Sequence, residues 1–236
     1  MKIKNNLRFL YQIVNYNLKI IFANKFFYFL LSAVGFFLMI AVINLWDVDY
    51  YPTESDVYYQ LLFPGLLLVF YPSVFGIQND MDTRMIELLF GIPNYRYKVW
   101  LVRLAIIYFM VFTMLLLLSL LGSVAIIPVS VFNMAFQLMF PVIFIGGLAF
   151  MLSTLIRNGN GTAAVMVMLG LAIWISSGIL EESKWNVFLN PFDYSTSINY
   201  DIWVEMIFYN RLYLIIGTIL TCLAGLYRLQ KREKFM

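Results

Sequence analysis

Six long apolar runs divide this chain, and they constrain its fold more than any other feature. A helix that crosses a lipid bilayer needs roughly 20 mostly apolar residues, and each run is about that long. The chain is 62% hydrophobic and 12% charged, whereas soluble domains carry about 25% charged residues. The sequence therefore predicts an all-α integral membrane protein with six transmembrane helices. We expect them at about Phe26–Trp46, Val57–Ile77, Val99–Leu121, Val131–Ile156, Thr162–Leu180 and Phe208–Tyr227.

The charged residues separate onto two sides of these spans. Fourteen of the 16 basic residues lie before the first span, around the connections between spans two and three and between spans four and five, or in the tail. Nine of the 13 acidic residues lie between spans one and two or between spans five and six. Because basic residues are retained on the cytoplasmic side, we expect both termini in the cytoplasm. The expected location is a cell membrane, in a bacterium the cytoplasmic membrane.

Three segments outside the spans have an ordered character. In residues 1–25, apolar residues recur every three or four positions, which predicts an amphipathic helix in the cytoplasmic headgroup layer or an extension of the first span. In the cytoplasmic loop 78–98, we expect Asp80 or Asp82 to cap a short apolar helix that packs on the bundle or on a partner protein. In the outer segment 181–205, dense aromatic residues predict short interfacial or re-entrant helices.

Missing residue types exclude several kinds of chemistry. The chain has no His and a single Cys, Cys222, which excludes a histidine proton relay, a cysteine-ligated zinc site and an internal disulfide. No Lys is followed by Ser or Thr, so the chain lacks the phosphate-binding loop of an ATPase. The net charge is only +3, and we expect no nucleic-acid partner. The spans hold no paired carboxylates, and we expect no enzymatic activity.

A few polar residues interrupt the spans. A charge at the bilayer centre costs about 2.5–3.5 kcal/mol on insertion scales, so such charges usually mark function. Arg103 and Arg211 lie near span ends, where we expect them to extend to the headgroups or, for Arg211, to pair with an outer acid such as Glu205. Asn133 and Gln137 share one helix face and are pathway candidates, or else they bond to a neighbouring helix.

The order of these features resembles the membrane subunit of type-2 ABC exporters, the ABC-2 permease family. The shared features are an amphipathic first helix, six spans, an apolar cytoplasmic helix after the second span, a Pro-containing aromatic segment before the sixth span, and a basic tail. Two stretches carry the resemblance most clearly, IELLFGIPNYRYKVWLVRL and LNPFDYSTSI. The 26–236 region would then be one six-helix transmembrane domain.

The resemblance implies partners and site residues. In that family the permease is not catalytic and holds no cofactor, and a separate ATPase subunit binds ATP and Mg²⁺. The helix that docks on this ATPase corresponds here to candidates Asp82, Arg84, Ile86, Glu87, Leu88, Leu89 and Phe90. Spans one and five of the family contact a second permease subunit, identical or different. The small residues that we expect there are Gly35, Ala163, Gly170 and Ser177, with packing inside one protomer as the alternative.

We therefore expect the permease subunit of an ATP-driven exporter that forms its pathway as a dimer among membrane lipids. No membrane-centred carboxylate supports a proton-driven or sodium-driven carrier. The apolar and aromatic spans favour a lipid-like, amphipathic or peptide cargo. A glycan cargo is the alternative, because aromatic side chains can stack on sugars. A different class of function also fits the pattern, namely an ABC-like membrane component that anchors or energises an envelope machine without moving a solute.

Overall fold

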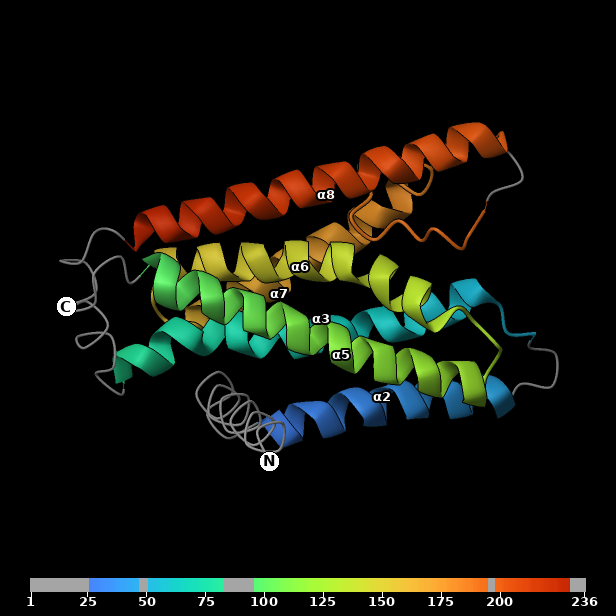
Figure 1. Ribbon diagram of the computed structural model, residues 1–236, viewed down its shortest axis with the longest axis horizontal. Coiled ribbons are helices and arrows are strands. Elements are labelled where there is room, and N and C mark those ends of the chain that lie inside the picture. The colour runs from blue at the N-terminus through green and yellow to red at the C-terminus, as the bar shows by residue number, and fades with distance from the viewer. Residues whose placement is uncertain (1–25, 47–50, 83–95, 195–197, 230–236) are drawn as a thin grey trace, which may run out of the picture.

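The structure is a computed structural model that describes residues 26–46, 51–82, 96–194 and 198–229 (Figure 1). Within these residues, six helices are long and apolar enough to cross a membrane, which confirms the expected all-α membrane class. A short π-helical turn, η1 (Arg96–Leu101), leads directly into α5. The six helices are α2 (Phe26–Trp46), α3 (Glu54–Asp82), α5 (Val102–Ala125), α6 (Val131–Ile156), α7 (Gly159–Ile179) and α8 (Tyr200–Arg228).

Two helices extend beyond the predicted spans. α3 and α8 have 29 residues each, which at 1.5 Å per residue is about 43 Å, more than the roughly 30 Å of hydrocarbon. α3 begins with a reciprocal cap: Thr53 Oγ1 accepts from the Asp56 backbone amide at 3.3 Å, and the Asp56 carboxylate accepts from the Thr53 amide at 2.8 Å. Its other end continues to Asp82. Asp80 therefore lies inside α3, and the expectation that it caps a separate helix is wrong.

α6 and α7 are joined by two residues. Arg157 has a φ of 60°, and its amide donates to Ser153 O at 3.0 Å, which ends α6 in a left-handed cap. Asn158 then accepts from the Gly161 amide at 3.0 Å and caps the start of α7. The tight turn makes α6 and α7 antiparallel neighbours.

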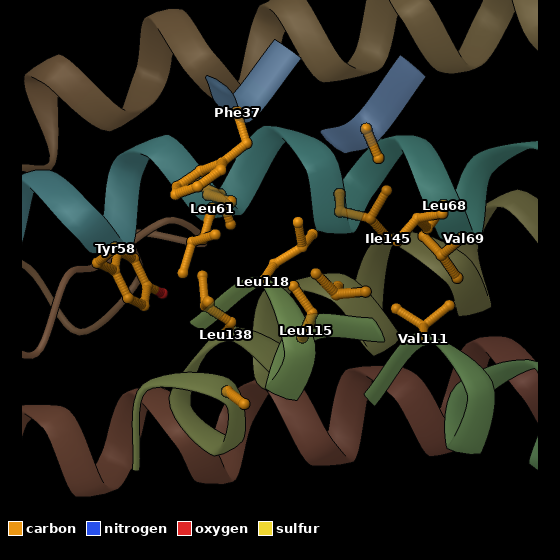
Figure 2. Close-up of a cluster of buried hydrophobic side chains, with 14 of the residues drawn as sticks. Phe37, Tyr58, Leu61, Leu68, Val69, Val111, Leu115, Leu118, Leu138 and Ile145 are labelled. Atoms are coloured by element: carbon orange, nitrogen blue, oxygen red, sulfur yellow. The ribbon is translucent and has the colours of Figure 1, made fainter. Parts of the chain in front are cut away.

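α3 and α6 form the centre of the bundle. α6 packs against α3, α5, α7 and α8, and α3 also packs against α2, α5 and α7. Figure 2 shows the apolar core where they meet, with Leu61 and Leu68 from α3, Leu115 from α5 and Leu138 from α6. α2, α7 and α8 lie at the edges of this arrangement and cover α3 and α6 (Figure 1).

α8 approaches α6 closely because of two glycines on α8. A Cβ atom built on Gly217 would lie 2.6 Å from the Phe144 ring, and one built on Gly225 would lie 2.6 Å from the Phe150 ring. Without a strong hydrophobic driving force in lipid, helices associate through such close packing at small residues. The two glycines therefore set the distance between α8 and α6.

Charge distinguishes the two ends of the bundle. We call the end where α3 begins the acidic end and the end where α3 finishes the basic end. Among the described residues, the acidic end carries Glu54, Asp56, Glu181, Glu182, Asp193, Asp201 and Glu205 together with Lys184 and Arg211. The basic end carries Arg103, Arg157 and Arg228 together with Asp80 and Asp82. The amphipathic helix expected in residues 1–25 lies outside the described residues, as do residues 83–95 of the cytoplasmic loop.

The connection between α7 and α8 differs from its prediction. Its described residues, 180–194 and 198–199, form turns and bends, and α8 begins at Tyr200 rather than at Phe208. The expected short helices are therefore wrong for the described part of this connection. Asparagine side chains there accept backbone amide hydrogen bonds that a helix would satisfy with its own carbonyls. Asn186 Oδ1 accepts from the Phe188 amide and Asn190 Oδ1 accepts from the Phe192 amide, both at 3.0 Å.

Candidate functional site

The first part of the site lies at the acidic end. There, residues 180–194, which we call the turn segment, include a stretch at 184–190 that runs alongside α8. Asn210 of α8 donates from Nδ2 to two backbone carbonyls of this segment, Lys184 O at 2.9 Å and Asn186 O at 2.7 Å. The Asn210 side chain is buried. Asn210 follows the start of α8 by ten residues, or about 15 Å of helix. The turn segment therefore folds back beside α8 to that depth instead of staying at its end.

Arg211 is buried beside Asn210 and is bonded to neutral acceptors. Its guanidinium donates from Nη1 to Asn210 Oδ1 at 2.8 Å, from Nη2 to Leu189 O at 3.1 Å and from Nε to Gln137 Oε1 at 2.9 Å. Arg211 is only 6% exposed. The expectation that it extends to the headgroups or pairs with Glu205 is wrong, because the turn segment and α6 bring neutral oxygen acceptors within its reach.

The turn segment is also bonded to α3. Asn190 Nδ2 donates to Ser55 O at 3.1 Å and to Ser55 Oγ at 2.9 Å, and Tyr58 Oη donates to Leu189 O at 3.4 Å. Non-helical backbone at membrane depth is tolerated only where protein groups satisfy its hydrogen bonds. The asparagines, Arg211 and Tyr58 meet this requirement, so the segment is held between α3 and α8.

A pocket of about 560 Å³ opens beside the turn segment. This volume falls within the range of about 300–1,000 Å³ that is typical of small-molecule sites. Its walls come from α3, α7, the start of α8 and the turn segment itself. The lining residues are Tyr59, Trp174, Ser177, Gly178, Glu181, Glu182, Asn186, Phe188, Leu189, Asn190, Asp193 and Trp203.

The second part of the site lies at the basic end, where an ion pair joins α3 to α5. Arg103 Nη1 lies 2.7 Å from Asp80 Oδ2, and Nη2 lies 3.3 Å from Oδ1. The Arg103 guanidinium also lies over the Trp100 ring, 4.8 Å from its centroid. The two charged side chains are 11% and 6% exposed, so the expectation that Arg103 extends alone to the headgroups is wrong. The ion pair forms because α3 continues past its predicted end and thereby places Asp80 opposite Arg103.

Further bonds connect the same end of α3 to α6 and α7. Gln78 Oε1 accepts from the backbone amide of Gly159, the first residue of α7. Ser153 Oγ of α6 donates to Val74 O at 3.0 Å. An apolar cluster packs beneath these bonds and consists of Ile77, Trp100, Leu104, Phe150, Leu226 and Leu229. The basic end of α3 is thereby bonded to α5, α6 and α7 together.

Of the expected ATPase contacts, the structure describes only Asp82. It is exposed at the last position of α3, and its carboxylate accepts from Gln78 Nε2 at 3.4 Å. The other candidates, Arg84, Ile86, Glu87, Leu88, Leu89 and Phe90, lie outside the described residues. α3 ends at Asp82 and η1 begins at Arg96, so the described residues on either side of these candidates lie at the basic end.

The candidates for a dimer contact have different surroundings. Gly35 of α2 is exposed and Gly170 of α7 is half-buried, and a Cβ built on either meets no other described part of the chain within 4 Å. Ala163 packs against the core of its own protomer. Ser177 donates to Ile173 O at 3.0 Å and lines the pocket. Gly35 and Gly170 are thus the candidates that a second subunit can reach.

The pathway candidates are also separated. Gln137 accepts from Arg211, which confirms the alternative that it bonds to a neighbouring helix. Asn133 is exposed near the start of α6. The structure does not bring the two side chains together in one pocket.

Sequence reasoning missed the side-chain bonds that join helices and turns within each end of the bundle. The missed acidic-end residues are Asn186, Asn190 and Asn210, and the missed basic-end pair is Asp80 with Arg103. One signal was present, since buried asparagines within an aromatic, membrane-facing stretch need partners. Pairing them required knowing how the turn segment folds back.

Comparison with protein-family models, with curated proteins and with solved structures finds no match for this chain. Its six apolar helices are those of a multi-pass membrane protein. Any narrower assignment depends on the sequence pattern and on the geometry of the two ends.

The Asn210 bonds predict a large effect for a small substitution. Asn210→Leu removes the donor to Lys184 O and Asn186 O, and unpaired buried polar groups cost about 1–3 kcal/mol each. We expect the apparent free energy of unfolding in detergent to fall by at least about 2 kcal/mol. Asn133→Leu makes the same chemical change at an exposed position and should be nearly neutral. Equal thermal midpoints for the two variants would show that the Asn210 bonds do not hold the turn segment.

The ion pair at the basic end predicts strong coupling between two residues. Asp80→Ala or Arg103→Ala alone removes one member of this largely buried ion pair and should cost about 3 kcal/mol. The double variant should cost no more than one single change, because both charges are then absent. A double-mutant cycle on thermal midpoints in detergent measures this coupling. Additive effects of the two substitutions would contradict it.

Proposed function

We propose that this chain is the permease subunit of an ATP-driven exporter, and that a separate ATPase subunit docks on residues 82–90 at the basic end. The observation that carries the proposal is the course of α3. This helix lines the pocket at the acidic end through Tyr59 and finishes at Asp82, where the proposed docking segment begins. One continuous helix therefore connects the place where force is applied to the place where a cargo leaves.

The bonds at the basic end suggest how the force is distributed. The docking segment connects α3 to η1 and α5, so a displacement of it acts on both helices. Because Asp80 binds Arg103, the adjoining ends of α3 and α5 move together. The bond between Gln78 and the Gly159 amide passes the displacement to α7, which forms another wall of the pocket. In this proposal ATP and Mg²⁺ are bound by the partner, since this chain has no phosphate-binding loop.

Burial supports a second permease subunit on α2 and α7. In the most apolar parts of the helices, 72% of residues are buried in α3 but only 22% in α8, 17% in α2 and 11% in α7. Gly35 and Gly170 lie on these two helices with open space beside them, which allows a neighbouring helix to approach closely. We propose that two copies, or this chain and a related one, pack through these helices.

The pocket favours export over a purely anchoring role. A component that only anchors an envelope machine has no use for a pocket of about 560 Å³ between its own helices. The pocket lies at the acidic end, which we propose faces away from the cytoplasm. An exported cargo would then pass through this pocket immediately before its release from the protein.

A charge placed in the docking segment tests the ATPase assignment. Leu89→Glu introduces a carboxylate into an apolar stretch, and we expect it to abolish association with the ATPase while the chain still inserts. The measurement is vanadate-sensitive ATP hydrolysis that co-purifies with the tagged chain from its own cells. Mass spectrometry of the same eluate should identify a chain with a phosphate-binding loop.

The matched control adds the same charge at the same end but outside the docking segment. Asn160→Glu lies in the first turn of α7, is exposed, and should retain the co-purified ATPase activity. If Leu89→Glu and Asn160→Glu recover equal ATPase activity, residues 82–90 are not the docking segment.

Site-specific labelling tests the orientation. In a Cys222→Ala background, a membrane-impermeant maleimide should label Glu54→Cys and Glu182→Cys in intact cells, because both side chains are exposed at the acidic end. Asn160→Cys at the basic end should be labelled only after lysis. The reverse pattern would place the acidic end in the cytoplasm and overturn the orientation.

A further inference from the structure

The pocket at the acidic end carries a strong charge imbalance. Glu181, Glu182 and Asp193 line it, and none of the described residues in its lining is a Lys or Arg. The two described basic residues of this end lie outside the lining: Arg211 is buried, and the exposed Lys184 has its Nζ atom 5.9 Å from the Trp185 ring centroid and 5.8 Å from that of Tyr209. In a cleft with low-dielectric walls, carboxylates of one sign focus the field and attract a counter-ion of opposite charge.

The remaining walls of the pocket are aromatic. Tyr59 from α3, Trp174 from α7, Phe188 from the turn segment and Trp203 from α8 all line it. Trp174 and Phe188 lie against each other, with ring centroids 6.2 Å apart. Aromatic faces attract cations, most strongly where water is excluded, and they also pack against apolar groups. Walls of this kind distinguish an organic cation from a small hydrated inorganic ion.

The placement of the acids also argues against a metal ion. Within the described residues, no group of three or more Cys, Asp or Glu side chains is arranged to hold a metal. Glu181, Glu182 and Asp193 are exposed, and the pocket that they line is far larger than an ion. A bulky cation that spans the pocket satisfies this arrangement better than one that needs a compact oxygen cage.

We propose that this pocket binds an organic ammonium ion that carries an apolar or aromatic group. The ammonium lies near Glu181 and Asp193, and the apolar group lies against Trp174 and Phe188. The bonds of Asn210 and Arg211 to the turn segment hold the Phe188 wall in position. Binding of this kind stands independently of whether the chain exports a cargo.

A soluble probe tests the proposal directly. Benzyltrimethylammonium is titrated into the full chain in dodecyl maltoside, a non-ionic detergent, and tryptophan fluorescence is followed, with Trp174 and Trp203 as reporters in the pocket. We expect saturable quenching that weakens as salt is added, because screening reduces the attraction between the ammonium and the carboxylates. N-benzylacetamide, which is neutral and of similar size, should not saturate.

Variants locate the binding. The double variant Glu181→Gln with Asp193→Asn should raise the dissociation constant by about tenfold or more, since it removes two charges from the pocket. Trp174→Leu should weaken binding while leaving the salt dependence in place. Glu205→Gln removes one outer carboxylate that is exposed on α8 outside the pocket, and it should bind as the unaltered chain does. Equal affinity of the double variant and Glu205→Gln would overturn the proposal, as would equal binding of the neutral probe.

One further arm distinguishes the source of the ammonium group. Phosphatidylethanolamine added to the detergent micelles competes with the probe if the pocket accepts a lipid headgroup. If it does not compete, a soluble amine is the ligand. Both results support the ammonium chemistry, whereas absence of saturable binding by the probe would refute it.

Discussion

The structure depends on one constraint, the lack of water inside a bilayer to satisfy polar groups. Every amide, carbonyl and charge at that depth must find its partner within the protein. Helices achieve this with their own backbone, but the turn segment between α7 and α8 does not. Asn210 and Arg211 supply the missing donors, and the same bonds leave the guanidinium surrounded by neutral acceptors. On the α8 side, the wall of the pocket is therefore held by these two adjacent residues, while Asn190 and Tyr58 bond it to α3.

The same constraint explains the ion pair at the basic end. Arg103 follows the start of α5 by one residue and is largely buried. Its charge therefore needs a partner of opposite charge, whereas a solvated arginine would be stabilised by water. Asp80 provides that charge from the last turn of α3. Bonding between charged partners at this position fixes two helix ends that the chain joins only through residues 83–95. Under the proposed function, this end receives force from the ATPase, and the ion pair makes the two helix ends move together.

Much of the architecture followed from apolar run lengths and charge, because these patterns are local. α2 has the predicted bounds, α6 likewise, and the turn at Arg157 falls where the sequence placed it. The wrong predictions concerned contacts between residues far apart in the sequence and the connection between α7 and α8. Both Arg103 and Arg211 were expected to extend to the headgroups because they lie near span ends. Arg103 instead pairs with Asp80, 23 positions away, and the acceptors of Arg211 include Gln137, 74 positions away. Helices were expected between α7 and α8 because aromatic density resembles an interfacial helix, whereas asparagine bonds favour turns.

α3 relates the two ends of the molecule. Tyr59 in the pocket and Asp82 at the basic end lie on the same helix, about 35 Å apart at 1.5 Å per residue. Pro64 and Pro72 lie between them, each removing one backbone hydrogen bond of the helix. A helix with two such positions bends more readily than an unbroken one, yet packing on α5 and α6 holds it along its length. Under the proposed function, a displacement at Asp82 would reach Tyr59 as a tilt of α3 within this packing. The tilt would move Tyr59 relative to the other walls and so change the shape of the acidic pocket.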